Sequence, residues 1–264
     1  MKRFYFLYFK IPLKQLRYLN GGSFVKLNFP PLFLRQKRLI SLQLKGIQHP
    51  IYVRSHSLID RSVLHYVFYR SYHLPPPGLG MPEVPIILDL GSNIGMTMLD
   101  FQRHYPKAQI FGYEMDQENF SIAQKNCQPY SALHIHHQAI WTEKKTLYYD
   151  ALSDADAYQL SESDADQKNQ KIAVETIRIA DILAEKNLEV VDYLKMDIEG
   201  AEIAIFNSQQ LDWLDKVRIL NLEIHQEALE NPQFILKVLE NKGFTTKMDS
   251  KEGNSILAYR SPEA

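Results

Sequence analysis

The stretch Ile86–Gly95, "IILDLGSNIG", joins a short apolar run to a turn that contains two glycines. An apolar run of this length, bounded by a turn, is typical of a strand buried on both faces, as strands of parallel sheets are. Gly91 and Gly95 permit a tight turn and let a ligand approach the backbone closely. The segment that begins in this turn, "NIGMTMLDFQRHYP", is predicted to be a helix with free N–H groups at its start. The stretch therefore predicts a strand, a turn and a helix, with a ligand at the turn.

The same alternation of apolar runs and helical segments continues toward the C-terminus. Further strands are predicted at residues 108–116, 133–141, 190–197 and 218–225, with helical patterns between them. Residues 145–151 predict a hairpin strand, and a short strand and helix follow from "AVETIRIADILAEKN". The last two strands, "TTKMD" and "SILAYR", are expected to pair antiparallel. Strands that alternate with helices indicate an α/β fold with a mostly parallel sheet.

A connector rich in proline and glycine, "LPPPGLGMPEVP", precedes this regular part. It divides the chain into an N-terminal extension, residues 1–80, and a main domain, residues 81–264. Within the extension, residues 1–48 are expected to be irregular, "GIQHPIYVRS" predicts a strand and "LIDRSVLHYVFYRSYHL" a helix. The polar, acidic segment 153–170 predicts a loop.

The composition is that of a globular protein, with 264 residues, 45% hydrophobic and 23% charged. The single cysteine, Cys127, excludes an internal disulfide and a cysteine-based zinc site, and it fits a reducing cytoplasm. Lys10 interrupts the apolar start and no small-residue cleavage site follows, so a secretory signal is not expected. We therefore expect a cytoplasmic protein.

The net charge of −1 conceals a strong asymmetry. Residues 1–59 contain no Asp or Glu and carry a charge of +11, which leaves 19 basic and 31 acidic residues for the remainder. Aromatic residues lie between the basic ones, so residues 1–45 are predicted to contact an anionic membrane at its inner face or a lipid-linked glycan. The alternative is that this segment packs against the acidic body. No nucleic-acid-binding motif is present, and nucleic acid is not an expected partner.

The residues after the first two strands indicate the kind of ligand. The first strand ends in D-x-G-x-x-x-G, which differs from the G-x-G-x-x-G that binds a dinucleotide pyrophosphate. Asp89 suits a ligand with a cationic part, such as the sulfonium of S-adenosylmethionine. Glu114 ends the next strand, 19 residues after Gly95, and a carboxylate there can accept hydrogen bonds from both ribose hydroxyls. Ala139 and Ile140, after the third strand, would flank an adenine ring, although ordinary strand packing explains them as well.

Four polar residues are predicted to converge at the ends of the fourth and fifth strands. "KMDIEGAE" places Asp197 at a strand end and Glu199 in the following turn, and strand alternation puts Glu223 and His225 on one side. These residues could supply the general base that removes a hydroxyl proton. Alternatively, two or three of the acids could hold a divalent cation, to which we do not commit. Glu202 is interpreted as a first-turn carboxylate that favours the helix dipole.

His134, His136 and His137 have the appearance of a metal cluster. Ile135 separates the first two, as a strand requires, and no acidic partner lies at a suitable spacing. We interpret them as strand histidines, and no metal ligand is predicted.

The motifs "ILDLGSNIGMT", "YEMDQENF", "VETIRIADIL" and "VDYLKMDIEGAE" occur in the order found in the FkbM-type S-adenosylmethionine-dependent methyltransferases, and the sequence resembles that family over residues 48–260. Met96-Thr97 and Met115 depart mildly from the family pattern. The resemblance implies a doubly wound, mostly parallel, seven-stranded Rossmann-like sheet with an antiparallel last strand. It also implies methyl transfer to a hydroxyl of a sugar, glycan, lipid or secondary metabolite.

By position in these motifs, the resemblance assigns the cofactor to a set that comprises Asp89, Gly91, Ser92, Asn93, Gly95, Glu114, Met115, Ala139, Ile140 and Asp197. Three other functions compete with O-methyl transfer. A cofactor-binding module without catalysis would be expected to have lost the acids, which are intact here. A nicotinamide-dependent oxidoreductase would require a glycine pattern that is absent. An amide N-methyltransferase often carries Asn/Asp-Pro-Pro-Tyr where this chain has "MDIEG".

Overall fold

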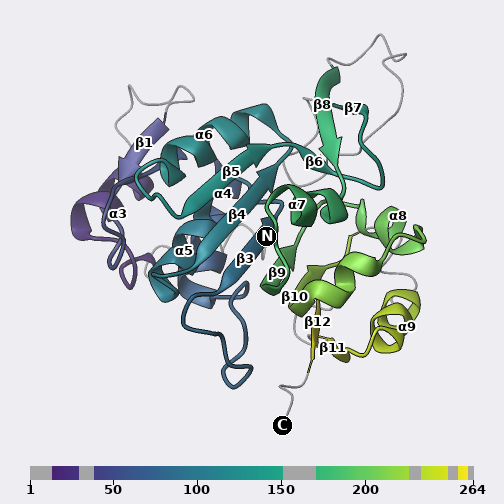
Figure 1. Cartoon of the computed structure of the whole chain (residues 1–264). Helices are drawn as coiled ribbons and strands as arrows, with labels where there is room; N and C mark the ends of the chain where they lie inside the picture. The colour runs from purple at the N-terminus through teal and green to yellow at the C-terminus, as the bar shows by residue number, and fades with distance from the viewer. Residues whose placement is uncertain (1–13, 30–38, 151–170, 226–232, 249–254, 261–264) are drawn as a thin grey trace.

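A seven-stranded sheet forms the centre of the molecule (Figure 1). The structure is a computed structural model that describes residues 14–29, 39–150, 171–225, 233–248 and 255–260. The strands, in spatial order, are β11 (Thr245–Met248), β12 (Ser255–Tyr259), β10 (Val217–Glu223), β9 (Val191–Met196), β3 (Ile86–Leu90), β4 (Gln109–Glu114) and β5 (Leu133–His137). β12 runs antiparallel to both of its neighbours, and the β10–β9–β3–β4–β5 pairs are all parallel. The predicted sheet, with its antiparallel last strand, is confirmed.

Helices cover both faces of the sheet, as a doubly wound fold requires. They are α5 (Met96–His104), α6 (Gln117–Cys127), α7 (Ile179–Glu185), α8 (Glu202–Asn207), the 3-10 helix η4 (Asp212–Lys216) and α9 (Gln233–Asn241). Successive residues of β3 point to opposite faces, so Leu88 and Leu90 pack with residues of α7, α8 and α9, whereas Ile87 packs with residues of α5 and α6. The continuous apolar run of β3 reflects this burial on both sides.

The N-terminal part packs on the same face of the sheet as α5 and α6. It contains α3 (Gly21–Asn28), a hairpin-like pair of β1 (Leu39–Leu42) and β2 (Ile51–Arg54), α4 (Leu58–His65) and the π-helical turn η3 (Tyr66–Arg70). Buried residues from each of these elements belong to one hydrophobic core with Ile87 of β3. The expectation that residues 1–48 are irregular is wrong for α3 and β1, which the tertiary core stabilises although their local pattern is weak.

Arg54 fixes this N-terminal part to the main sheet through a network of polar contacts. Its guanidinium pairs with the buried Asp60 at 2.8 Å and donates to Asn119 of α6, also at 2.8 Å. The Asp60 carboxylate in turn accepts from the backbone N–H of Arg54. Because the pair is buried and its hydrogen bonds are made, it holds the extension in a defined place.

The predicted third strand is divided in two. β5 ends at His137, where its register with β4 also ends, and the N–H of Gln138 makes a last hydrogen bond to the carbonyl of Glu114 at 3.1 Å. The next two residues form β6 (Ala139–Ile140), which joins a separate small sheet with β7 (Thr146–Asp150) and β8 (Lys171–Ile177). The predicted single strand over 133–141 is therefore corrected. The loop predicted at 153–170 lies outside the described residues.

Candidate active site

A pocket with an empty volume of about 570 Å³, partly open to solvent, lies beyond the carboxyl ends of β3, β4 and β9. This is the place where open α/β sheets bind ligands. The pocket lining combines backbone turns, acids and small apolar side chains, and it consists of Gly91, Asn93, Tyr113, Glu114, Met115, Asn119, Gln138, Ala139, Ile140, Asp197, Ile198 and Glu199. Seven of the ten predicted cofactor residues are among them.

Gly91 brings the turns after β3 and β9 into direct contact. Its φ is +82°, and a Cβ atom built on it would lie 1.7 Å from the carbonyl oxygen of Asp197. The N–H of Asp197 also donates to the carbonyl of Leu90 at 3.0 Å. Only glycine fits a left-handed position with backbone packed this closely, so the sequence here is dictated by the approach of two turns.

Glu114 occupies the end of β4 and is held by backbone donors. One carboxylate oxygen accepts from the N–H of Asn93 at 2.7 Å and the other from the N–H of Asp116 at 2.8 Å. Burial raises the pKa of Glu114 to about 7, and the two backbone hydrogen bonds oppose that rise. The carboxylate is therefore fixed in orientation, as a group that accepts ribose hydroxyls must be.

Three of the predicted cofactor residues, Asp89, Ser92 and Gly95, do not line the pocket. Asp89 is fully buried and faces the protein's own cation, Lys195, at 3.5 Å, because the register of β3 with β9 pairs these two residues. Ser92 donates to the carbonyl of Asp89 at 2.8 Å. Gly95 begins α5 at a φ of +81°, and a Cβ there would meet Cys127 at 3.2 Å, so it serves helix packing.

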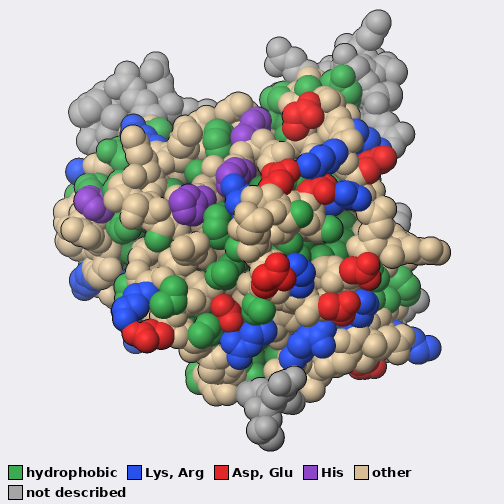
Figure 2. Space-filling model, in the orientation of Figure 1, with side chains coloured by type: hydrophobic (Ala, Val, Ile, Leu, Met, Phe, Trp, Pro, Cys, Tyr) green, Lys and Arg blue, Asp and Glu red, His purple; other side chains and the backbone are tan. Residues whose placement is uncertain are grey.

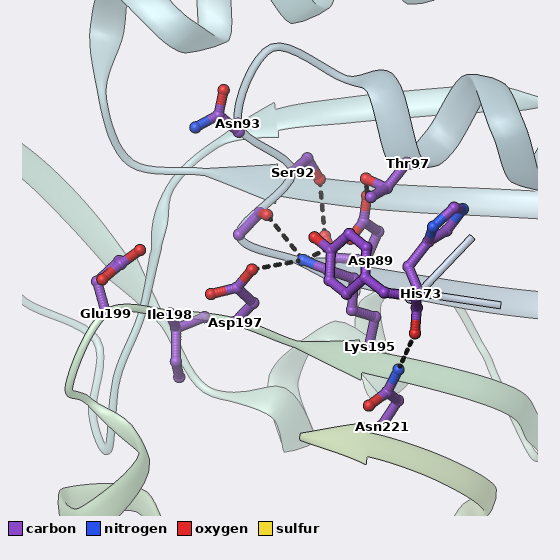
Figure 3. A network of polar contacts seen from close by, with 12 residues as sticks. His73, Asp89, Ser92, Asn93, Thr97, Lys195, Asp197, Ile198, Glu199 and Asn221 are labelled. Carbon is purple, nitrogen blue, oxygen red and sulfur yellow. Dashed lines mark hydrogen bonds and ion pairs between the residues drawn. The ribbon is translucent and has the colours of Figure 1, made fainter. Parts of the chain in front are cut away.

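Lys195 is a buried cation at the centre of the polar network (Figure 3). Its Nζ lies 3.2 Å from Asp197 Oδ2 and from the carbonyl oxygen of Gly91, and 3.5 Å from Asp89 Oδ1. Burial alone would lower the pKa of Lys195, but the charges of Asp197 and Asp89 outweigh it, and the pKa lies well above its usual value. Sequence reading did not single out this residue, because a lysine inside an apolar strand carries no motif.

Asp197, Glu199 and His225 meet at the mouth of the pocket. His225 Nε2 lies 3.6 Å from Asp197 Oδ1 and 3.6 Å from Glu199 Oε2. Glu199 adopts a left-handed backbone conformation with a φ of +54°, which is strained for a residue with a side chain and occurs at functional sites. The turn after β9 therefore holds two carboxylates toward one imidazole.

These charges shift the pKa values of the cluster. Burial raises the pKa of Glu199 to about 8, and the neighbouring charge of Asp197 adds to the rise. Burial alone would lower the pKa of His225, but a hydrogen bond to Glu202 and the charges of Glu199 and Asp197 raise it to about 9. At neutral pH, His225 is thus cationic and Glu199 is mostly protonated, which leaves the Asp197 carboxylate as the proton acceptor of the cluster.

Glu223 does not line the pocket, but it completes a group that could hold a metal ion. Asp197, Glu223 and His225 each offer one ligand atom, and these three atoms lie within 4.8 Å of one another. The three histidines of β5, by contrast, stack on aromatic rings: His134 on Phe111 and His136 on Tyr113. His137 stacks on Phe120 of α6. Figure 2 shows histidine side chains gathered on the molecular surface in this region.

Two further residues lie near the cluster. Glu202, interpreted from the sequence as a first-turn carboxylate that favours the helix dipole, is fully buried and pairs with His225. Tyr72 belongs to the N-terminal part, and Asn221 of β10 donates to its carbonyl at 3.4 Å. Burial raises the pKa of Tyr72, Lys195 lowers it, and Asp197 and Glu223 raise it further, so the phenol faces the same charges. Neither local spacing nor composition signals such long-range contacts.

S-adenosylmethionine fits the residues present in the pocket. A glycine turn that excludes any side chain, a fixed carboxylate at the end of β4 and the apolar Ala139 and Ile140 provide for backbone approach, ribose and adenine. The pocket also has the size typical of cofactor sites, about 300–1,000 Å³. With the order of its strands, this site places the chain among the Rossmann-like, S-adenosylmethionine-dependent methyltransferases.

Residues 89–246 match the family model described as the methyltransferase FkbM domain, and the chain belongs to this family. Methyltransferase sdnD of Sordaria araneosa is 26% identical over 208 residues, which cover 65% of this chain and 78% of that protein. The 2-O-methyltransferase NoeI of Sinorhizobium fredii is 29% identical over 169 residues, which cover 59% of this chain and 69% of that protein.

Two solved structures align at low identity. Aeropyrum pernix fibrillarin with natively bound S-adenosyl-L-methionine is 12% identical with a TM-score of 0.41, over 87% of this chain and 84% of that chain. Human methyltransferase-like protein 13 in complex with SAH is 16% identical with a TM-score of 0.43, over 72% of this chain and 78% of that chain. Separately, no helix in the described ranges is long and apolar enough to cross a membrane.

Proposed function

We propose that this enzyme methylates a hydroxyl group of a sugar or glycan. The observation that carries the proposal is the cluster at the pocket mouth, where His225 Nε2 lies 3.6 Å from both Asp197 and Glu199. An alcohol is a weak nucleophile while it keeps its proton, so O-methyl transfer needs a positioned proton acceptor. Asp197 and Glu199 line the pocket and can face an acceptor hydroxyl.

The residues divide the reaction between binding and proton removal. Bound S-adenosylmethionine supplies the methyl group: the new bond joins it to the acceptor oxygen, the C–S bond breaks and its electron pair stays on sulfur. The hydroxyl proton passes to the carboxylate of Asp197 and from there to water. Lys195 and His225 hold that carboxylate in place from either side. Such a base contributes roughly 10²–10⁴-fold to the rate.

A sugar acceptor is supported by the chemistry of the pocket mouth and by one relative. Sugars present several hydroxyls, and two carboxylates beside an imidazole offer acceptors for more than one of them. The relative NoeI is named a 2-O-methyltransferase.

The test uses cofactor labelled in its methyl group and matched acceptors. Each sugar or oligosaccharide is offered beside its deoxy analogue, which lacks one hydroxyl, and beside an amino-sugar that carries nitrogen at the same position. We expect label on oxygen, located by mass spectrometry, and no label on the matching deoxy analogue. Label on nitrogen or carbon, or an acceptor without hydroxyls that reacts equally well, would contradict the proposal. A fractionated cell extract, labelled in the same way, identifies the acceptor class.

We further propose that residues 1–45 bring the enzyme to an anionic membrane at the inner face, where a lipid-linked acceptor would lie. On α3, Val25 is 53% exposed and Lys26 is exposed beside it, and the following Phe29 is 68% exposed. Exposed apolar side chains next to basic ones suit the headgroup region of an anionic bilayer.

Co-sedimentation with vesicles tests this second proposal. Binding is expected with vesicles that contain anionic lipid, and it should weaken as salt rises, because counterions screen the attraction. A Val25→Ser, Phe29→Ser variant should bind less and keep its activity on a soluble acceptor. Equal binding to neutral and anionic vesicles would exclude an electrostatic membrane contact.

A further inference from the structure

Glu202 is a buried carboxylate behind the cluster at the pocket mouth. It is the first residue of α8 and is fully buried, whereas the side chains of Asp197 and Glu199 are 19% and 25% exposed. A buried carboxylate is costly unless hydrogen bonds or an opposite charge compensate it. Helix-dipole stabilisation at the surface, the expected role of Glu202, does not explain its burial.

One partner of Glu202 is the imidazole of the cluster. His225 Nδ1 lies 3.0 Å from Glu202 Oε1, and the N–H of Ile198 donates weakly to the same oxygen at 3.4 Å. The second oxygen, Oε2, has no hydrogen-bond partner among the described residues. The interaction with His225 is therefore the strongest that Glu202 makes there.

The contact at Nδ1 determines the direction in which the other ring nitrogen, Nε2, points. With Nδ1–H donated to Glu202, Nε2 is directed at Asp197 and Glu199, 3.6 Å from each. A carboxylate behind an imidazole fixes its tautomer and the orientation of its ring. Rotation of the ring would lose the 3.0 Å contact and leave the Glu202 charge buried without it.

The two kinds of acid around His225 thus differ in position and in access. Asp197 and Glu199 belong to the turn after β9 and line the pocket, and Glu223 ends β10 nearby. Glu202 belongs to α8 and reaches His225 from the protein interior. Among the acids in the described ranges, Glu202 is the one that forms an ion pair with Nδ1.

We propose that Glu202 is a positioning residue, which binds Nδ1–H of His225 and so orients the ring with Nε2 toward the two acids of the pocket mouth. The inference rests on the proposed function, because it assigns His225 to the proton-removing cluster. Glu202 itself touches no substrate. Its loss should lower the rate of methyl transfer without weakening cofactor binding.

The first test is nitrogen-15 NMR of the enzyme labelled in histidine, above the pKa of His225. The neutral ring of His225, assigned with a His225→Gln variant, should carry its proton on Nδ1. A neutral ring protonated on Nε2 in the unmodified enzyme overturns the inference. This measurement requires no substitution of Glu202, so it holds even if that variant fails to fold.

The second test compares Glu202→Gln with Glu199→Gln, since each removes one negative charge next to His225. Both variants should lower the pKa of His225. Only Glu202→Gln should weaken the preference for the Nδ1–H tautomer, and its kcat should fall by roughly 10–100-fold with KM for the cofactor within about twofold. Equal tautomer preference in both variants, or a loss confined to KM, counts against the inference.

These readouts separate the inference from the function on which it rests. If the label enters nitrogen or carbon while His225 is protonated on Nδ1, the proposed reaction fails and the pairing stands. If oxygen is methylated and His225 is protonated on Nε2, only the positioning role fails.

Discussion

The two sides of the pocket use carboxylates in different ways. On the β3–β4 side, both oxygens of Glu114 accept hydrogen bonds from backbone N–H groups, and no basic side chain contacts it among the hydrogen bonds and ion pairs of the described residues. On the β9–β10 side, Asp197 and Glu199 lie beside each other and beside two cationic side chains, Lys195 and His225. The first side fixes one group in space, and the second places several titratable groups in mutual interaction.

This difference indicates how the pocket divides its tasks. A carboxylate held by backbone donors keeps its orientation and suits recognition of an invariant part of a cofactor. Titratable groups that interact strongly shift one another's pKa values, and such perturbed groups suit chemistry. The two sides meet at Gly91, whose backbone contacts that of Asp197.

The largest effect is expected where the two sides join. Gly91→Ala places a Cβ 1.7 Å from the carbonyl of Asp197, and the backbone must move to accept it. The free energy of unfolding should fall by about 4 kcal/mol or more. Gly78→Ala is the matched control, since Gly78 also has a positive φ, +101°, but nothing lies within 4 Å of the added atom. That variant should lose only about 1–2 kcal/mol.

Urea denaturation measures both variants. If Gly91→Ala is no less stable than Gly78→Ala, the close contact between the two turns does not exist in solution. The two sides of the pocket then do not meet at Gly91.

The next effect separates the two sides by their kinetic consequences. Asp197→Asn should lower kcat by roughly 10²–10⁴-fold, because it removes a proton acceptor. Glu114→Gln should weaken cofactor binding by roughly 10–100-fold, because hydrogen bonds to a charged group contribute about 1.5–3 kcal/mol. Asp197→Asn should change the cofactor affinity by less than about threefold, and Glu114→Gln should change kcat by less than about threefold.

Isothermal titration gives the cofactor affinity and a labelled-methyl assay gives kcat. An Asp197→Asn enzyme that turns over at the original rate would show that Asp197 takes no part in proton removal. A Glu114→Gln enzyme that binds the cofactor normally would remove the ribose role.

Local spacing predicted which residues end the strands on both sides of the pocket, but not which side chains face them. Gly91 and Glu114 are local features, because a strand end and a turn are set by neighbours in the chain. The misplacement of Asp89 has a specific cause: its cationic partner, Lys195, is 106 residues away, and only the register of β3 with β9 brings them together. Strand alternation places Asp89 on one face of the sheet but does not identify the side chain that lies next to it on β9.

Glu202 is a second residue whose position in the chain predicts its element but not its contacts. Its place in a first helical turn was predicted correctly, yet the helix packs inward and the carboxylate meets His225, which follows β10. The break of the third strand after His137 likewise depends on where β4 ends and on the pairing of β6 with β8, which local patterns do not encode. Elements and strand ends follow from local spacing, whereas the pairing of charges follows from packing between distant segments.

A smaller effect concerns stability against pH. Glu114, Glu199 and His225 all have pKa values raised by folding, to about 7, 8 and 9. The folded state therefore binds more protons than the unfolded state, and stability falls as pH rises. The part due to Glu114 is lost by pH near 7, whereas Glu199 and His225 lose theirs as pH passes through about 8 and 9. Between pH 7.5 and 9, only the β9–β10 side should titrate.

Unfolding free energies at pH 7.5 and 9 test this assignment. The unmodified enzyme should lose about 1–2 kcal/mol over that interval, a figure reduced for partial exposure of the cluster. Glu199→Gln should lessen the loss, because it removes one titrating group and weakens the attraction for the His225 proton. Glu114→Gln should leave the loss intact. If Glu114→Gln abolishes the loss of unfolding free energy, the titrating group lies on the β3–β4 side, and the assignment to the β9–β10 side is wrong.

The smallest effect is expected on removal of divalent metal. Asp197, Glu223 and His225 could together bind an ion, but Asp197 already has the ammonium of Lys195 at 3.2 Å. The raised pKa of His225 also keeps that imidazole cationic at neutral pH, and a metal ion would have to displace its proton. Dialysis against EDTA should therefore change the initial rate by less than about twofold. If the rate is lost and Mg²⁺ or Mn²⁺ restores it, the β9–β10 side is a metal centre, and the charge of Lys195 serves the fold more than the reaction.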